Sequence, residues 1–213
     1  MKIYSSPVAP SPRKVIIFIA EKGIENIQVK NLDLGKLEHK TSEYKKIAPN
    51  SRVPALELDS GEIILETTAI CRYLECIYPE PNMFGSSPME IAQIEMWYSR
   101  VSFELMMPLM HGFRHTHPHM SQLENQNNEF GIAQRELAIK SLRHYDEVIA
   151  NKDYISCNKF TYADIQMVTS LQFLVRLNKI DISDYPNLDS YINNIAARPV
   201  SYTHLTLPTI CSV

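Results

Sequence analysis

Apolar and polar positions in the first 80 residues follow two different periods, which predict short strands and amphipathic helices in alternation. Ser60-Gly61 is a turn signal between two apolar runs and predicts a hairpin there. The strands are expected at residues 1–5, 27–30, 53–58 and 62–65, and the helices at 13–22, 38–47 (one or two turns) and 66–78. The order begins strand–helix–strand, a parallel crossover, and predicts a small mixed sheet with helices on both faces.

The pattern changes after Pro79-Glu-Pro-Asn82, because only helical spacing continues beyond this proline-rich stretch. One helix is expected to run from about residue 91 until Pro108, and a last one to begin at Pro186. Thr161 and Asp164 have the spacing of a capping box ahead of a strongly apolar segment. We therefore predict a mixed-sheet domain at residues 1–79, a linker at 80–85 and an all-helical domain at 86–199.

The final residues, 200–213, continue neither pattern. Their sequence resembles the translation of a transposon-end adapter used in sequencing libraries. We expect them to be a non-native tail, which leaves Cys211 without meaning for the fold.

Composition excludes several classes of partner. The chain has 213 residues, 45% of them hydrophobic, and a net charge of −3 without a basic block, which argues against nucleic acid. It shows no membrane-length apolar run and no signal-peptide pattern, so we expect a cytoplasmic protein. Cys71, Cys76 and Cys157 lack metal or disulfide spacing, and we expect free thiols. The four histidines between residues 111 and 119 do not form a convincing metal site, so no metal is expected.

The candidate chemistry is concentrated where the predicted hairpin meets the helix at residues 66–78. Val53-Pro54 begins one strand, and Glu66-Thr67 begins the helix, whose free N–H groups and positive dipole end favour anions. An exposed strand edge beside a helix N-terminus suits a small peptide that carries carboxylates.

Several motifs in order along the chain give it a family resemblance. From residue 1 to about 199, it resembles the cytosolic glutathione S-transferases, and especially bacterial and fungal members with an Ala-Pro-x-Pro first turn. The resemblance implies a thioredoxin-like domain followed by an all-α domain, usually in a homodimer. The motifs are residues 6–15 (SPVAPSPRKV), 20–23 (AEKG), 37–40 (LEHK), 52–54 (RVP), Glu66-Thr67 and Thr161-x-x-Asp164.

The same resemblance implies how glutathione would bind. A cis bond before Pro54 would leave the Val53 N–H and C=O to pair with the cysteinyl backbone, although an ordinary trans proline is the simpler alternative. Glu66 would hold the γ-glutamyl ammonium and Thr67 its carboxylate, unless both only cap the helix. The glycyl carboxylate would be bound by His39, Lys40 and Arg52. Alternatively, these side chains are only solvated surface groups.

The thiol-activating position departs from the family pattern. Ala9 stands where many members carry a serine, cysteine or tyrosine. Ser11 could donate to the sulfur, but a role as helix N-cap ahead of Pro12 is more ordinary. Alternatively, the helix dipole and amides suffice, with a water held by His111 or His115. The catalytic candidates are therefore Ser11 and His115.

The second substrate would meet an apolar wall from the helical domain, formed by Met106, Met110 and Phe113. Tyr98 lies nearby in sequence, but we expect it in the core. The predicted function is conjugation of glutathione to small, largely apolar electrophiles in detoxification, with glutathione as substrate and no cofactor. The alternatives are a glutathione-dependent reductase or peroxidase, which a first-turn cysteine would favour, and a non-catalytic glutathione-binding protein.

Overall fold

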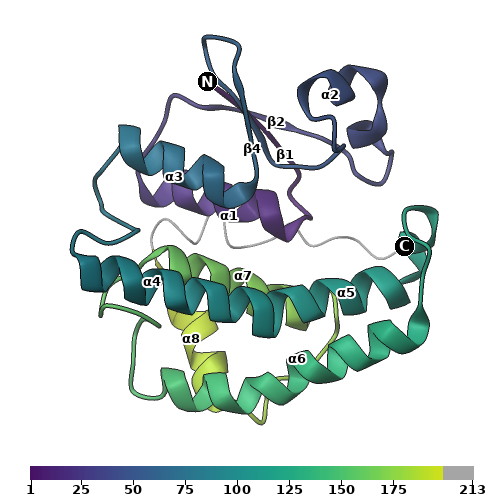
Figure 1. The fold of residues 1–213 in the computed structure, drawn as a ribbon. Coiled ribbons are helices and arrows are strands. Elements are labelled where there is room, and N and C mark those ends of the chain that lie inside the picture. Colours follow the sequence, from purple (N-terminus) through teal and green to yellow (C-terminus); the bar gives the residue numbers. More distant parts are fainter. Residues whose placement is uncertain (199–213) are drawn as a thin grey trace. The chain divides into compact units, whose positions relative to one another are not determined.

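The computed structural model describes residues 1–198, so the predicted non-native tail at 200–213 and Cys211 lie outside the described residues. The chain forms two compact units that divide between residues 83 and 84, and residues 196–198 belong with the first unit. Figure 1 shows a sheet-containing unit and a helical unit, as the two periods in the sequence predicted.

The first unit is a four-stranded mixed sheet in the order β2-β1-β3-β4. Strands β1 and β2 are parallel, whereas β1 with β3 and β3 with β4 are antiparallel. The predicted crossover and hairpin are therefore confirmed. The elements are β1 (Lys2–Ser5), α1 (Pro10–Glu21), β2 (Gln28–Asn31), η1 (Glu38–Lys40), α2 (Ser42–Ile47), β3 (Ala55–Glu57), β4 (Ile63–Leu65) and α3 (Thr67–Ile77).

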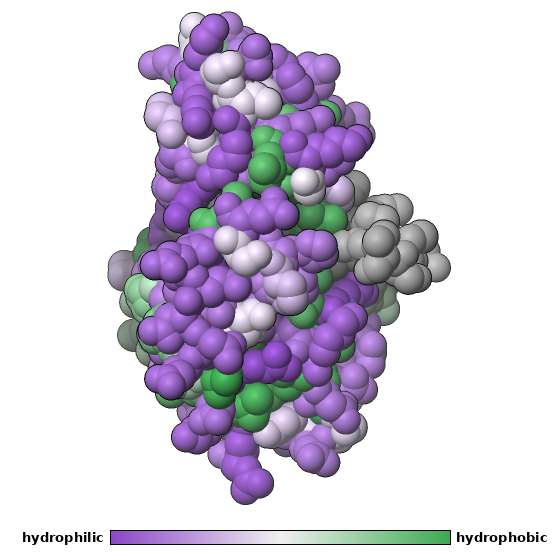
Figure 2. All heavy atoms as spheres, turned by 90° about the vertical axis from the view of Figure 1, so that its right-hand side faces the viewer, coloured by the Kyte–Doolittle hydropathy of each residue, from purple (hydrophilic) through white to green (hydrophobic). Residues whose placement is uncertain are grey.

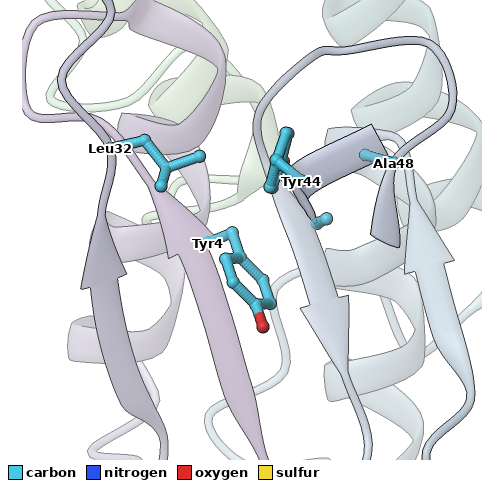
Figure 3. Close-up of a cluster of buried hydrophobic side chains, with 5 residues drawn as sticks. Tyr4, Leu32, Tyr44 and Ala48 are labelled. Carbon is cyan, nitrogen blue, oxygen red and sulfur yellow. The ribbon is translucent and has the colours of Figure 1, made fainter. Parts of the chain in front are cut away.

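Alternation along the strands assigns side chains to the two faces of this sheet. Ile3 pairs with Leu56 across β1 and β3, and both are fully buried on the face that α1 and α3 cover. Tyr4 belongs to the opposite face, where it packs with Tyr44 of α2 and with Ala48, the residue that follows this helix (Figure 3). The helices thus lie on both faces of the sheet, as predicted.

Helix α1 begins three residues earlier than the sequence pattern indicated. Pro10 occupies a first-turn position, where its fixed φ suits the helix and its missing N–H costs nothing. Ala9 is the N-cap, with extended backbone and no capping side chain. Ser11 therefore lies inside the first turn, and its expected role as N-cap is wrong. Gly23, at φ +63°, ends the helix as predicted.

The regular structure of the second unit is entirely helical. It differs from the prediction at Pro108, where no helix ends. The helix expected to end there instead continues through a π-helical segment. Because proline has no N–H and clashes with the carbonyl four residues earlier, a wider turn before it allows the helical path to go on. The elements are α4 (Pro88–Val101), η2 (Ser102–Met106, π), α5 (Met107–Thr116), η3 (Pro118–Gln122), α6 (Asn128–Ile149), α7 (Tyr162–Arg176) and α8 (Pro186–Ala196).

Helix α7 forms the centre of this unit, and Asp164 organises its start. The carboxylate accepts bonds from the N–H and hydroxyl of Thr161, both at 2.8 Å, which confirms the predicted capping box. It also accepts bonds from the Ile155 N–H at 2.8 Å and the Tyr191 hydroxyl at 2.7 Å. Burial nevertheless raises the pKa of Asp164 to about 6.

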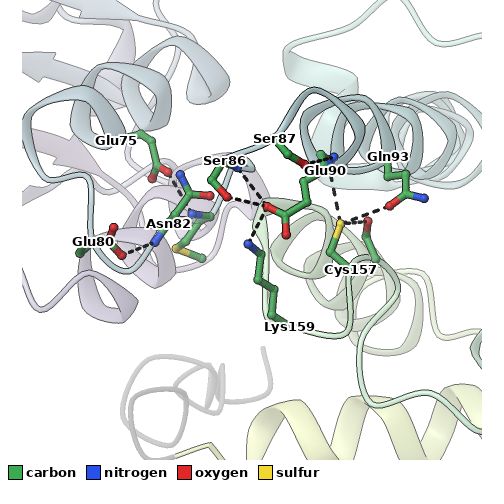
Figure 4. Close-up of polar contacts among 11 residues, drawn as sticks. Glu75, Glu80, Asn82, Ser86, Ser87, Glu90, Gln93, Cys157 and Lys159 are labelled. Carbon is green, nitrogen blue, oxygen red and sulfur yellow. Dashed lines mark hydrogen bonds and ion pairs between the residues drawn. The ribbon is translucent and has the colours of Figure 1, made fainter.

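A second cap, at the start of α4, was not predicted. The Ser87 hydroxyl accepts the Glu90 N–H at 3.2 Å, and the Glu90 carboxylate accepts the Ser86 N–H at 3.0 Å. Lys159 also donates to Glu90, at 2.9 Å (Figure 4). Bonds from Ser86 and Lys159 lower the pKa of Glu90 to about 2. This cluster fixes where the helical unit begins.

The polarity of the surface agrees with the composition of the chain. The face drawn in Figure 2 is largely hydrophilic, with smaller apolar groups between. None of the described helices is long and apolar enough to cross a membrane. Cys71 is buried and Cys76 is exposed, and neither forms a disulfide bond within the described residues.

Candidate functional site

The residues predicted to bind glutathione at the hairpin all lie within the first unit. Ala55 pairs with Leu65 at the end of the β3–β4 ladder, and Val53 and Thr67 each lie two residues beyond this last pair. The Val53–Pro54 peptide is cis, and Pro54 is buried. Among residues 1–198, nothing pairs with the Val53 N–H or C=O. An extended peptide could therefore add to the sheet edge at this residue.

Glu66 has a backbone conformation that non-glycine residues rarely adopt. It is the N-cap of α3 at φ +70° and ψ 127°, and its exposed side chain makes no capping hydrogen bond. Such a conformation costs about 1–3 kcal/mol, and residues that keep it are concentrated at functional sites. Capping, the simpler alternative for Glu66, is therefore not what its side chain does. The carboxylate is available to a ligand, beside the N-terminus of α3.

The residues expected at the glycyl carboxylate differ in exposure. Lys40 and Arg52 are exposed, whereas His39 is only 7% exposed. Burial, with a smaller effect from Lys40, lowers the pKa of His39, so its ring is neutral at pH 7. His39 can thus offer an N–H, whereas Lys40 and Arg52 carry the positive charge among these three residues.

The first turn of α1 offers one residue with both a free hydroxyl and an N–H. Pro10 and Pro12 lack N–H groups, and the Arg13 N–H donates to the Ala9 carbonyl at 3.4 Å. Within the described chain, the Ser11 hydroxyl forms no hydrogen bond, and the residue is half-buried. Both Ser11 groups lie at the positive end of the helix, where a thiolate is stabilised.

His115, the second catalytic candidate, lies on α5 of the helical unit. Its Nδ1 accepts the Asn127 N–H at 3.0 Å, and its ring meets Phe130 edge-on at 5.1 Å between centroids. When neutral, a ring with an accepting Nδ1 carries its proton on Nε2. His115 can therefore donate through Nε2, but it cannot act there as a base.

The candidates for the second-substrate pocket also belong to the helical unit. Met106 is buried, whereas Met110 and Phe113 are half-buried. Phe113 contacts the rings of His117 and Phe173, at 4.5 and 5.5 Å between centroids. A role in binding stays a prediction for all three. Tyr98, which was expected in the core, is half-buried and stacks on the buried Tyr162 at 5.1 Å between ring centroids.

Comparison with known proteins decides the family. The model of the glutathione S-transferase N-terminal domain matches residues 8–76, and that of the C-terminal domain matches residues 103–199. Glutathione S-transferase 2 of Saccharomyces cerevisiae is 35% identical over 176 residues, which are 81% of this chain and 76% of the yeast protein. The chain belongs to the glutathione S-transferase family. Its fold is thus the two-domain architecture that the motifs implied.

Solved structures of the family agree with this assignment. The crystal structure of Gtt2 from S. cerevisiae has a TM-score of 0.88 at 31% identity, covering 96% of this chain and 100% of that one. A glutathione S-transferase domain-containing protein from Marinobacter aquaeolei has a TM-score of 0.87 at 33% identity, covering 94% and 100%. These relatives favour the transferase function over the reductase and binding-only alternatives.

Similarity extends to proteins with other names. A probable elongation factor 1-gamma 1 of Arabidopsis thaliana is 26% identical over 193 residues, which are 89% of this chain but 45% of that protein. The electrophile and the roles of single residues therefore have to be argued from this chain itself. In residues 1–198, no three His, Cys, Asp or Glu side chains gather as metal ligands would.

Proposed function

We propose that this glutathione transferase binds glutathione along the Val53 edge of its sheet and conjugates it to small, largely apolar alkyl or aryl electrophiles. The thiol loses its proton, and its sulfur bonds to the electrophilic carbon as the leaving group departs. The observation that carries the proposal is the conformation of Glu66. Its carboxylate lies at the N-terminus of α3 and makes no capping hydrogen bond to the helix. A ligand with an ammonium and a carboxylate at one end matches this pair of charges. The γ-glutamyl group of glutathione has both.

The remaining binding roles follow the tripeptide along the site. Val53 pairs its N–H and C=O with the cysteinyl backbone beside Pro54, and Thr67 offers its hydroxyl and N–H to the γ-glutamyl carboxylate. Arg52 and Lys40 provide positive charge for the glycyl carboxylate, and His39 provides an N–H. The charged ends are thereby held apart, with the cysteine between them.

Thiol activation in this proposal depends on the first turn of α1. A free thiol has a pKa of about 8.5, so only a small fraction is ionised at pH 7. The Ser11 N–H and hydroxyl, with the helix dipole, favour the thiolate. Support comes from the unpaired Ser11 hydroxyl and from Ala9, which offers no side-chain donor. In the alternative arrangement, His115 holds a water that contacts the sulfur.

The wider proposal concerns the second substrate and the assembly. Met106, Met110 and Phe113 form the apolar wall for the electrophile, in keeping with detoxification in the cytoplasm. The chain acts as a homodimer. Support for the dimer comes from an apolar row on α4 and η2, Met89, Met96 and Phe103, which recur every seven residues and are all exposed.

Conjugation of chlorodinitrobenzene, measured beside calorimetric binding of glutathione, tests this function. Glu66→Ala is expected to weaken glutathione binding about 10- to 100-fold, the effect of losing a charge-assisted hydrogen bond. Glu62→Ala is the control, because Glu62 is an exposed carboxylate in the same hairpin. Unchanged affinity in Glu66→Ala would contradict the binding assignment. Binding without turnover of several electrophiles would exclude conjugation.

A further inference from the structure

One hydrogen bond fixes the peptide group that joins Arg52 to Val53. The Tyr44 hydroxyl, on α2, donates to the Arg52 carbonyl at 2.7 Å. The carbonyl and N–H of a trans peptide point in opposite directions. Holding the Arg52 carbonyl toward Tyr44 therefore directs the Val53 N–H away from α2. That N–H is the donor at the open sheet edge.

Tyr44 is itself firmly held. Its N–H donates to the Thr41 cap at 3.3 Å, its ring lies 5.6 Å from that of Tyr4, and only 3% of the residue is exposed (Figure 3). Burial, with a smaller effect from Tyr4, raises its pKa to about 12. The hydroxyl thus remains a donor throughout the physiological pH range.

The segment that Tyr44 holds has little regular structure of its own. Ser51 is at φ +54°, a conformation that favours glycine, and the Arg52 N–H turns back to the Asn50 side chain at 3.2 Å. No strand includes residues 51–54. The direction of the Val53 N–H consequently depends on the bond from outside the segment, which Tyr44 supplies.

We infer that Tyr44 is a positioning residue for glutathione, because its hydroxyl holds the 52–53 peptide so that the Val53 N–H meets the cysteinyl carbonyl of the tripeptide. The inference rests on the proposed function. No sequence motif marks Tyr44, which on sequence grounds is one more aromatic residue in a short helix.

Tyr44→Phe tests the role by removing only the hydroxyl. Affinity for glutathione is expected to fall about five- to tenfold, the effect of one neutral hydrogen bond. The KM for glutathione should rise in parallel, while kcat at saturating glutathione and the KM for the electrophile stay within about twofold. Tyr4→Phe is the matched control, because it removes the other hydroxyl of the same ring pair, which donates to Glu57 at 2.7 Å. Equal affinities in the two variants would overturn the inference.

A second ligand distinguishes the contribution of the Val53 N–H to binding from that of the Arg52 side chain. The glycyl ethyl ester of glutathione lacks the carboxylate expected at Arg52 but keeps the cysteinyl carbonyl. Arg52→Ala should weaken binding of glutathione and leave binding of the ester nearly unchanged, whereas Tyr44→Phe should weaken both. If the Tyr44→Phe effect disappears with the ester, Tyr44 acts through Arg52, and the assignment to Val53 is wrong.

Two further outcomes keep the inference distinct from the proposed function. If the wild-type chain does not bind glutathione, the proposed function fails. If it binds and Glu66→Ala weakens it, but Tyr44→Phe matches Tyr4→Phe, only the inference fails. Should Tyr44→Phe not fold, the amide resonance of Val53 in the wild-type chain still decides. It should move to lower field when glutathione is added, and an unmoved resonance would refute both the inference and the Val53 pairing in the proposed function.

Discussion

The ammonium of Lys22 pairs with the carboxylate of Glu75, joining the end of α1 to α3. The Lys22 side chain is fully buried, and its Nζ also donates to the carbonyls of Tyr78 and Pro79, at 2.8 and 3.2 Å. Glu75 in turn accepts the Met83 N–H at 2.9 Å. Two charges removed from water are thus compensated by each other and by backbone groups.

Removing one member of this pair should be strongly destabilising. Lys22→Met leaves a buried carboxylate and two carbonyls without their donor, so the free energy of unfolding should fall by about 3–5 kcal/mol in urea titrations. Lys22→Met/Glu75→Gln should recover part of the loss. Lys2→Met is the control, since the Lys2–Glu57 pair is partly solvated and should contribute much less. Equal losses in Lys22→Met and Lys2→Met would show that the Lys22–Glu75 pair has no special role.

Stability should also depend on pH through Asp164. Its pKa is raised from 3.8 to about 6, so the native state keeps a proton that the unfolded chain releases at lower pH. The stabilisation is complete below about pH 4 and is lost as pH rises through 6, a change of about 3 kcal/mol. Unfolding free energies of the wild type and Asp164→Asn between pH 4 and 7.5 isolate this contribution. Their difference should shrink as pH rises, and a constant difference would contradict it.

Tyr191→Phe provides a milder test of the same carboxylate. In the wild type, the hydrogen bond from the Tyr191 hydroxyl lowers the pKa of Asp164. The variant lacks this bond, so the pKa of Asp164 should rise further. The native state would then lose stability with rising pH over a range that extends above pH 6. Parallel curves for the variant and the wild type would count against this coupling.

Thiol activation can be assigned by two substitutions. Ser11→Ala should raise the pKa of the bound glutathione thiol by about one unit, because one hydrogen bond to the thiolate is lost. Thiolate absorbance titrated against pH gives this value directly. His115→Ala is expected to leave it nearly unchanged. The reverse result would assign thiolate stabilisation to the water held by His115.

The dimer can be tested at the apolar row on α4 and η2. Phe103 is 65% exposed, so Phe103→Asp should cost the subunit little stability but place a charge in the proposed interface. Sedimentation velocity should show a dimer for the wild type and a monomer for the variant. Leu137→Asp, at an exposed apolar position on α6, should remain dimeric. A monomeric wild type would remove the dimer from the proposal.

The sequence by itself determined the two domains and most of the elements, because period-two and helical spacing directly reflect which side chains are buried. It also located the Thr161–Asp164 capping box and the helix end at Gly23, because caps depend on residues close together in the chain. The family resemblance singled out Val53-Pro54 and Glu66-Thr67, and their roles in binding stay predictions. The sequence pattern placed the start of α1 too late and ended a helix at Pro108. In both cases a proline, Pro10 or Pro108, lies in the first turn of a helix, where the backbone needs no N–H.

Only the tertiary structure decided which distant groups meet. Tyr191 reaches Asp164 across 27 positions, and Lys22 reaches Glu75 across 53, so no local pattern announces either contact. The positive φ of Glu66 and the hydrogen bond from Tyr44 to Arg52 could not be predicted from the sequence either, because neither depends on a local pattern. A side chain's identity limits what it can donate or accept, but its partner is fixed by how the whole chain packs.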